Sequence, residues 1–322
     1  MAIAYITHHD CQLHDMGPGH PEQPARLSAI NNRMIASGLE VVMQQYDAPL
    51  AKRGQLEAVH DPDYIDRIFT STPAQGLAWI DADTAMNRCS LDAALRAAGA
   101  VVLGVDLVMQ GKAKQVFCAV RPPGHHAERR RAMGFCLFNN IAVGAYHAIN
   151  HYGLERVAIV DFDVHHGNGT EDIVAGDERI LFCSTFQHPF YPYTGSGSRA
   201  TNVVNTPLAA GSNGTDFRQA VTSQWLPRLE QFAPELMLIS AGFDAHQADD
   251  MAGLNLVDSD YAWVTRKLCE QADMSAQSRI VSSLEGGYEL HALARSVEAH
   301  INAFLGDDLF ERSQAVLTAL DS

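Results

Sequence analysis

In residues 157–170, VAIVDFDVHHGNGT, an apolar run typical of a buried strand ends abruptly in acidic and imidazole side chains, and the rest of the chain is interpreted around this segment. If residues 157–165 are extended, side chains two positions apart share one face. Asp161, Asp163 and His165 then point one way, and the apolar residues between them point the other way. Carboxylates and an imidazole at a strand end, before a glycine-rich turn, indicate a metal site. The alternative is a strand end with a capping aspartate and surface histidines.

The composition is that of a folded, acidic protein. Hydrophobic residues make up 47% of the 322 residues and charged residues 19%, which predicts one globular domain, 1–322, with a sizeable core. The 23 lysines and arginines against 38 aspartates and glutamates give a formal net charge of −15, which opposes binding to a phosphate backbone. We therefore expect no nucleic-acid ligand and a preference for cationic partners.

Targeting signals and cysteine pairs are not apparent in the sequence. The N-terminus has no basic leader, and no window offers eighteen uninterrupted apolar residues, so we expect a cytoplasmic protein that does not enter a membrane. The six cysteines show no Cys-x-x-Cys spacing, and three of them lie inside apolar runs, which favours reduced thiols. The pattern leaves open whether the protein forms a homo-oligomer.

Strand and helix patterns alternate along most of the chain. Strands are expected at 2–7, 116–120, 157–160, 180–183, 235–240 and 279–284. Helices are expected at 25–37, 59–70, 91–110, 137–152, 216–232, 258–273 and 289–305. Residues 8–24, which contain GPGHPEQP, and residues 71–88 are expected to be irregular. This alternation predicts an α/β fold with a single open, mostly parallel β-sheet and helices on both faces.

Four apolar runs pass directly into titratable residues. They are FCAVRPPGHH at 117–126, VAIVDFDVHH at 157–166, LMLISAGFDAH at 236–246 and RIVSSLEGGY at 279–288. In an open parallel sheet the ligand crevice lies beyond the carboxyl ends of the strands. We therefore expect the four strand ends to form one site.

Three further side-chain groups have the chemistry of such a site. The tandem His125 and His126 can divide base, acid and electrostatic roles beside a metal, although exposed loop histidines are the alternative. Asp244 can supply a third metal ligand, or cap a helix. Tyr288 can donate a hydrogen bond to a carbonyl oxygen and polarise it, or be an ordinary half-buried tyrosine.

The segments RPPGHH, GFCLFNN, DFDVHHGNG, SAGFDAH and EGGY, in this order, resemble the histone deacetylase family. The Asn of HHGNG and the Glu of EGGY resemble its class II branch and bacterial relatives. The resemblance covers nearly the whole chain and implies an arginase/deacetylase-like fold with the site at the C-terminal strand ends. It also implies one zinc ion held by Asp163, His165 and Asp244, for which Fe(II) or Co(II) could substitute.

The resemblance assigns a role to each catalytic candidate. It implies that His125 is the general base, His126 an electrostatic partner or acid, and Tyr288 the donor to the scissile carbonyl. It implies that Asp161 orients His125. Asn168 stands where class I members have an aspartate, and the missing charge removes one reason for His126 to be protonated.

The resemblance also implies a substrate channel and a second cation site. The residues expected to contact the acyl-lysine substrate are Asp83, Gly134, Phe135, Tyr191, Pro192 and Met251. The residues expected to hold a monovalent cation, K⁺, are Asp161, Asp163, His165, Ser184 and Thr185.

The predicted reaction is metal-dependent hydrolysis that removes acetyl or other short acyl groups from lysine side chains. An acetylpolyamine or other small acylamide deacetylase is one alternative, and an arginase-like two-metal hydrolase is another. A metal- or ligand-binding sensor without turnover is an alternative of a different class. Met251 stands at the rim position where related polyamine enzymes place an acidic residue, so the sequence favours acyl-lysine.

Overall fold

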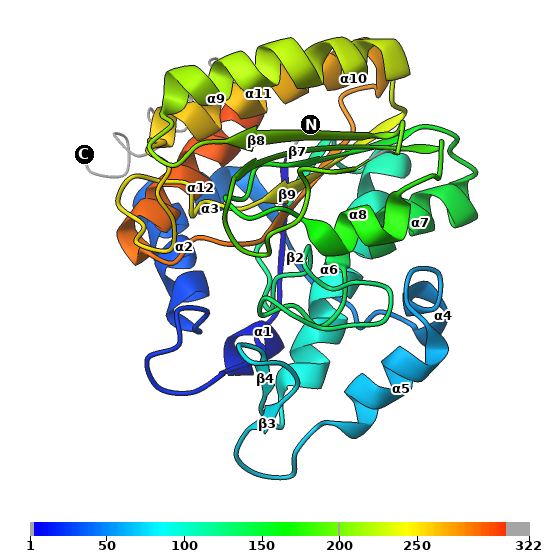
Figure 1. Ribbon diagram of the computed structural model, residues 1–322, viewed down its shortest axis with the longest axis vertical. Coiled ribbons are helices and arrows are strands. Elements are labelled where there is room, and N and C mark those ends of the chain that lie inside the picture. Colours follow the sequence, from blue (N-terminus) through cyan, green and yellow to red (C-terminus); the bar gives the residue numbers. More distant parts are fainter. Residues whose placement is uncertain (1–2, 199, 307–322) are drawn as a thin grey trace.

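The computed structural model describes residues 3–198 and 200–306. Its centre is an eight-stranded sheet with the order β2-β1-β5-β10-β9-β6-β7-β8, in which every neighbouring pair is parallel (Figure 1). The strands are β1 (Ile3–Thr7), β2 (Met43–Asp47), β5 (Gln115–Cys118), β6 (Val157–Asp161), β7 (Ile180–Gln187), β8 (Val203–Leu208), β9 (Leu236–Ala241) and β10 (Ile280–Leu284). The short strands β3 (Ala78–Trp79) and β4 (Ala85–Met86) form a separate antiparallel pair. The predicted parallel sheet is confirmed.

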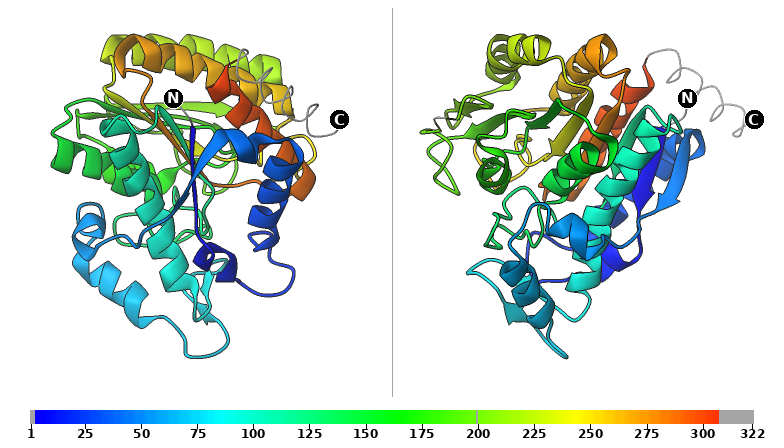
Figure 2. Two further views of the ribbon diagram at one scale, coloured as in Figure 1. Left: turned by 180° about the vertical axis from the view of Figure 1, so that it is seen from behind. Right: turned by 90° about the vertical axis from the view of Figure 1, so that its right-hand side faces the viewer.

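Helices cover both faces of this sheet (Figures 1 and 2). On one face, α6 (Ser90–Met109) and α7 (Asn140–Tyr152) pack against each other and against the central strands. On the other face, α11 (Asp258–Ser275) packs on α12 (Leu290–Leu305), which also contacts α2 (Ala25–Ala36). The remaining helical elements are α1 (Asp10–Leu13), α3 (Leu39–Val42), α4 (Arg53–Leu56), α5 (Pro62–Thr70), α8 (Asn168–Val174), α9 (Gly214–Ala220), the π-helical turn η1 (Val221–Trp225) and α10 (Leu226–Phe232). None of the helices in the described part of the chain is both long and apolar enough to span a membrane.

The central strands are buried along their whole length. Every residue of β6, β7, β9 and β10 is buried, including the polar residues in their carboxyl-terminal halves, as expected for strands covered by helices on both faces. Helix α6 approaches the sheet closely at Gly104, where an added Cβ would lie 2.7 Å from Val281 Cγ1. The six cysteines are all free, as predicted.

Several short elements differ from the sequence prediction. The edge strands β2 and β8 were not predicted, because edge strands leave part of their surface to solvent and carry polar residues. Helix α1 lies inside residues 8–24, which were expected to be irregular, and it forms before the first glycine of that segment. The β3–β4 pair lies inside residues 71–88, also expected to be irregular. Residue 2 of the predicted first strand lies outside the described residues.

A buried ionic network ties the segment before α2 to the strand ends. Arg121, after β5, donates from Nη2 to Glu22 Oε2 at 2.6 Å, and both side chains are fully buried. Burial alone would raise the pKa of Glu22, but the charge of Arg121 outweighs it and holds that pKa well below its usual value. Arg26 contacts Glu22 and donates from Nε to the carbonyl of Gly287 at 2.6 Å. The network therefore fixes the backbone of the EGGY turn.

Candidate active site

The four strand ends singled out in the sequence meet in space. Strands β5, β10, β9 and β6 are consecutive neighbours in the sheet, and all run in the same direction. Their carboxyl ends therefore lie side by side, although the segments are far apart in the chain. The side chains discussed below project from the loops that follow these strands.

The metal corner is formed after β6, in a way that differs from the sequence prediction. Strand β6 ends at Asp161, one residue beyond the predicted strand 157–160, so the condition that residues 157–165 are all extended does not hold beyond Asp161. Asp161 Oδ1 accepts a hydrogen bond from the N–H of Asp163 at 3.1 Å, and Asp163 Oδ1 accepts one from the N–H of His165 at 2.8 Å. Such bonds from an aspartate to the backbone two residues on form tight turns, which compete with strand pairing.

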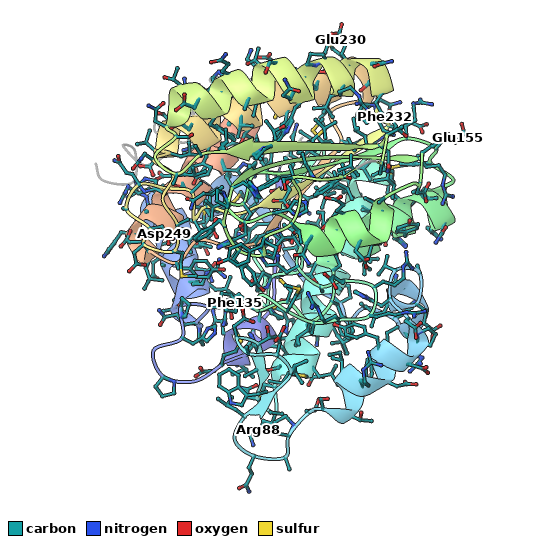
Figure 3. All side chains as sticks on the ribbon, in the orientation of Figure 1. Arg88, Phe135, Glu155, Glu230, Phe232 and Asp249 are labelled. Atoms are coloured by element: carbon teal, nitrogen blue, oxygen red, sulfur yellow. The ribbon has the colours of Figure 1, made fainter. Side chains whose placement is uncertain are left out.

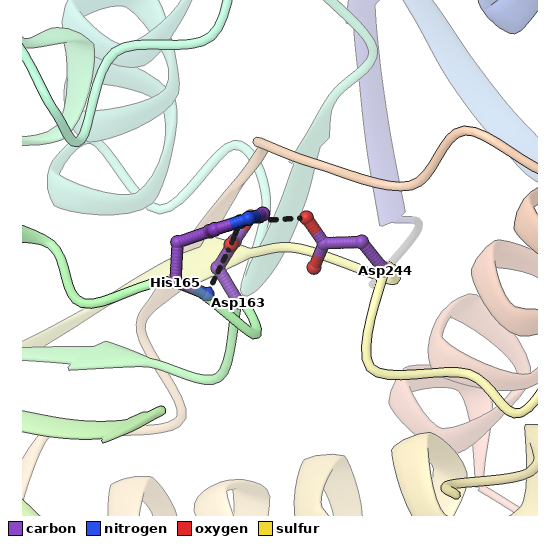
Figure 4. Close-up of side chains that lie close together, drawn as sticks. All are labelled: Asp163, His165 and Asp244. Atoms are coloured by element: carbon purple, nitrogen blue, oxygen red, sulfur yellow. Dashed lines mark hydrogen bonds and ion pairs between the residues drawn. The ribbon is translucent and has the colours of Figure 1, made fainter. Parts of the chain in front are cut away.

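Asp163, His165 and Asp244 nevertheless converge. One ligand atom from each lies within 4.8 Å of the others, and all three side chains are buried. His165 Nδ1 is 3.0 Å from Asp163 Oδ1 and 3.2 Å from Asp244 Oδ2 (Figure 4). Burial alone would lower the pKa of His165, but the two carboxylates raise it to about 10. Burial, with the charge of Asp163, raises the pKa of Asp244 to about 6.

This donor set fits a divalent metal. Asp244 Oδ1 accepts a hydrogen bond from the N–H of Val164 at 2.9 Å. Asp244 Oδ2 is buried and has no hydrogen-bond partner among the described residues, and the atom it pairs with, His165 Nδ1 at 3.2 Å, is itself a candidate ligand, so both atoms can bind a cation. Two carboxylates and one imidazole are ligands that Zn²⁺ and similar cations accept, and three protein ligands leave a position for substrate.

Two glycines make room for this corner. A Cβ at Gly242 would lie 2.0 Å from Asp163 Oδ2, and one at Gly286 would lie 2.1 Å from Asp244 Oδ2. Both distances are far below a van der Waals contact, so these positions exclude any larger residue. The N–H of Gly286 also donates to Asp163 Oδ2 at 2.8 Å.

The two histidines after β5 are adjacent but have different partners. Their ring centroids are 4.0 Å apart. His125 Nδ1 contacts Asp161 Oδ2 at 2.9 Å, whereas His126 Nδ1 contacts Asn168 Oδ1 at 2.7 Å. Burial opposes the charged form of His125, but Asp163 and Asp161 outweigh it and raise its pKa to about 10. Burial, with the charges of His125 and His165, holds the pKa of His126 well below 6.5.

Tyr288 follows the EGGY turn and faces the same space. Its ring packs edge-on against Phe135, with centroids 6.0 Å apart, and the Arg26 guanidinium lies 4.9 Å from its centroid. Its hydroxyl makes no hydrogen bond to any described residue. Burial raises the pKa of Tyr288 well above 10, so the hydroxyl keeps its proton at neutral pH.

A cavity of about 220 Å³ leads to these groups. Its lining consists of Asp83, His126, Gly134, Phe135, His165, Phe190, Tyr191, Met251 and Tyr288. The lining thus includes five of the six residues expected in the channel, but not Pro192. Phe190, which was not predicted to line the channel, stacks on His165 with a distance of 5.5 Å between the ring centroids. Figure 3 labels Phe135 in the middle of the molecule.

The residues expected around a monovalent cation also lie together. Asp161 on β6 pairs in register with Ser184 on β7, and Thr185 follows it. Ser184 Oγ is buried and has no hydrogen-bond partner among the described residues. Asp161 already accepts bonds from His125 Nδ1 and from the N–H of Asp163. An unsatisfied buried oxygen beside a buried carboxylate fits a cation.

The site also contains two residues, Glu285 and His20, to which the sequence analysis assigned no role. Glu285, the Glu of EGGY, accepts from the N–H groups of Gly124 and His125 at 2.7 and 3.1 Å, and burial raises its pKa to about 7. His20, from the proline-rich loop, packs edge-on against Phe135 at 4.7 Å between centroids. Its Nε2 lies 3.3 Å from the carbonyl oxygen of Asp83. In the sequence, Glu285 is marked by its position directly after an apolar run and by its place in the EGGY segment.

Comparison with known proteins agrees with this geometry. Residues 20–304 match the histone deacetylase domain. The chain is 41% identical to an uncharacterized Synechocystis protein, over 92% of this chain and 97% of that one. It is 32% identical to a probable deacetylase of Archaeoglobus fulgidus, over 96% and 88% of the two chains. The crystal structure of the HDA15 HD domain matches with a TM-score of 0.89 and 34% identity, covering 95% of this chain and 90% of that one.

Some of the similar proteins are much longer than this chain. The chain is 34% identical to Type-2 histone deacetylase 2 of Dictyostelium discoideum but spans only 21% of its length. The similarities together support deacetylase activity, which is hydrolysis of an amide bond, and a metal cofactor at the site. From the domain match and the relatives that align along nearly the whole chain, the protein belongs to the histone deacetylase family.

Proposed function

We propose that this protein is a zinc-dependent amidohydrolase that removes acetyl or other short acyl groups from lysine side chains. The observation that carries the proposal is the convergence of Asp163, His165 and Asp244 beside a narrow cavity whose wall includes His126 and Tyr288. The three candidate metal ligands, the two histidines and Tyr288 all lie beyond the carboxyl ends of strands of one sheet, which supports a single catalytic domain. Binding of nucleic acid is not part of the proposal, because of the net charge of −15.

Zinc is the preferred metal for this ligand set, with Fe(II) or Co(II) as substitutes. The set has two carboxylates and one imidazole, whereas non-haem iron oxygenases use two histidines and one carboxylate. A zinc ion held there would acidify water and polarise the amide carbonyl group. An arginase-like pair of metals is less well supported, because the described residues contain one group of this kind.

The contacts of the two histidines suggest a division of roles that differs from the family-based expectation. Asn168 Nδ2 donates to Glu128 Oε1 at 2.8 Å, so Asn168 turns its oxygen towards His126 Nδ1. His126 therefore carries its proton on Nδ1, and its Nε2 is free to accept a proton from the attacking water. Asp161 stabilises positive charge on His125, whose Nε2 is also 3.8 Å from Asp163 Oδ2. We assign His126 as the base and His125 as the cationic partner.

Tyr288 would donate a hydrogen bond to the carbonyl oxygen as it gains negative charge. Phe135, Tyr191 and Phe190 form apolar walls that suit the methylene chain of lysine and keep water away from the reaction. Asp83 lines the cavity and can accept a hydrogen bond from the substrate backbone. These groups together bind, orient and polarise an extended acylated amine.

The first expected result concerns the substrate: acetyl-lysine peptides should be hydrolysed in preference to N8-acetylspermidine. Met251 lines the cavity and offers only apolar contact. Asp249, which could have attracted a distant ammonium group, is buried and accepts main-chain hydrogen bonds, and this leaves Asp250 as the exposed acid beside it. The measurement is kcat/KM for both substrates with the zinc-loaded enzyme. A tenfold or greater advantage for the polyamine would identify the enzyme as a polyamine deacetylase.

Potassium completes the proposal as a structural cation beside the active site. Its ligands would be the side chains of Asp161 and Ser184 with backbone oxygens of Asp163, His165 and Thr185. The unsatisfied Ser184 Oγ supports this assignment. A cation there would help to hold Asp161, which in turn contacts His125.

Ser184→Ala is expected to raise the K⁺ concentration needed for half-maximal activity by about tenfold, because one oxygen contact to a charge is lost. The measurement is turnover as a function of KCl at constant ionic strength. Ser283→Ala is the matched control, since Ser283 Oγ on β10 is also buried and unpartnered within the described chain. Equal K⁺ dependence in the Ser184 variant and the wild type would remove Ser184 from the cation site.

A further inference from the structure

One buried carboxylate connects the rim of the cavity with the backbone of Tyr288. Asp249 lies in the loop between β9 and α11 and is 5% exposed. Its Oδ1 accepts from the N–H of Met251 at 3.1 Å. Its Oδ2 accepts from the N–H groups of Tyr288 and Glu289 at 2.6 and 3.0 Å. Figure 3 labels Asp249 in the part of the view where α2 and α12 lie.

Tyr288 depends on its main chain for its position. It lies between Gly287, which has a φ of 117°, and α12, whose N-cap is Glu289. Its ring packs against Phe135 and Arg26, but no hydrogen bond from a described residue fixes the hydroxyl at the far end of the side chain. On one side, the Gly287 carbonyl accepts from Arg26 Nε at 2.6 Å. On the other side, Asp249 is the acceptor for the Tyr288 N–H.

We propose that Asp249 is a positioning residue that sets the location of the Tyr288 hydroxyl and couples it to Met251 at the rim. This inference rests on the proposed amide hydrolysis, in which Tyr288 stabilises the oxyanion. An ionised carboxylate offers acceptors on both oxygens, so it can serve both segments at once. Asparagine offers one acceptor and one N–H₂ group, and that donor would face a backbone N–H on one side. The substitution therefore disrupts one of the two connections.

Asp249→Asn is expected to lower kcat by about 10- to 100-fold, the scale of loss caused by a small misplacement of a reacting group. KM should change by less than about threefold, and zinc content should stay at one per chain. Asp249→Glu keeps the carboxylate and should recover part of kcat. Asp250→Asn, at the exposed neighbouring position, is the matched control and should behave like the wild type. An Asp249→Asn enzyme with wild-type kcat overturns the inference.

A double-mutant cycle with Tyr288→Phe separates positioning from general damage to the fold. If Asp249 acts through the Tyr288 hydroxyl, adding Asp249→Asn to Tyr288→Phe should lower kcat by less than about threefold. If the decrease in kcat of the double variant equals the product of the two single decreases, Asp249 acts independently of the Tyr288 hydroxyl and the inference is wrong. If the Asn chain does not fold, the same cycle is carried out with Asp249→Glu, and the same two outcomes decide.

The cycle also distinguishes failure of this inference from failure of the proposed function. Hydrolysis of acetyl-lysine by the wild type, and a loss of kcat in Tyr288→Phe alone, test the function without involving Asp249. If both are observed and the cycle is multiplicative, only the role of Asp249 is wrong. If the wild type does not hydrolyse acetyl-lysine, the proposed function is wrong, and the inference that depends on it falls with it.

Discussion

Asp163→Ala is expected to remove the catalytic metal and the turnover together. Asp163 contributes one of three ligand atoms that lie within 4.8 Å of each other, and its Oδ2 accepts from the N–H of Gly286. Its loss therefore removes a ligand and also loosens the EGGY turn. Metal affinity should fall by more than about 10²-fold, since even the loss of an outer partner of a ligand costs 10- to 100-fold. The measurements are zinc content after dialysis and acetate release from an acetyl-lysine peptide.

Glu230→Ala is a suitable control for this variant. Glu230 is an exposed acid on α10, and Figure 3 labels it at the end of the molecule remote from Phe135. The Glu230→Ala enzyme should bind one zinc ion per chain and hydrolyse the peptide at the wild-type rate. Full metal occupancy and full turnover in Asp163→Ala would show that the ligand set is wrong.

Tyr288→Phe is expected to lower kcat by about 10² to 10³-fold while changing KM little, which is the usual loss for one oxyanion donor. The hydroxyl is useful only when the carbonyl oxygen gains charge, so its loss affects the transition state more than the bound substrate. Burial raises the pKa of Tyr288 well above 10, so the hydroxyl stays protonated. The decrease in kcat caused by Tyr288→Phe should therefore be similar from pH 6 to pH 9. The measurement is steady-state kinetics with an acetyl-lysine peptide across that range.

Tyr261→Phe controls for removal of a buried hydroxyl. Tyr261 is fully buried on α11, and its hydroxyl has no hydrogen-bond partner among the described residues. Its substitution should leave kcat unchanged and should not lower stability, because no hydrogen bond is lost. An unchanged kcat in Tyr288→Phe would exclude that hydroxyl from the mechanism.

The arrangement of the site followed from the sequence wherever it depended on strand direction. The apolar runs before Arg121, Asp161, Asp244 and Glu285 are long enough and continuous enough to be buried parallel strands, and parallel strands bring their carboxyl ends to one edge. The residue after each strand end therefore had to lie near the others. The chemistry of aspartate, histidine and tyrosine then indicated a metal and an oxyanion donor.

The local geometry of the loops after these strands was harder to predict from the sequence. The argument from alternation required residues 157–165 to be extended, but backbone bonds to the aspartate side chains turn the chain after Asp161. Both arrangements place Asp163 and His165 near each other, so the ligand set did not depend on the error. In the segment HPFYP, either Phe190 or Pro192 could face the cavity, and only the packing of His165 against Phe190 decided which one does.

The central strands, their carboxyl ends and the reactive residues could be predicted from the sequence, because each leaves a pattern within a few neighbouring positions, whereas the polar edge strands β2 and β8 could not. The distant groups that support the reactive residues became evident only in the folded chain. Gly242 and Gly286 are glycines because carboxylates from other segments occupy the space of a side chain. Asp249 and Tyr288 are joined by a hydrogen bond between a carboxylate and a backbone N–H, which any residue except proline provides. A contact of that kind leaves no trace in the identity of its partner, so it becomes visible only when the chain is folded.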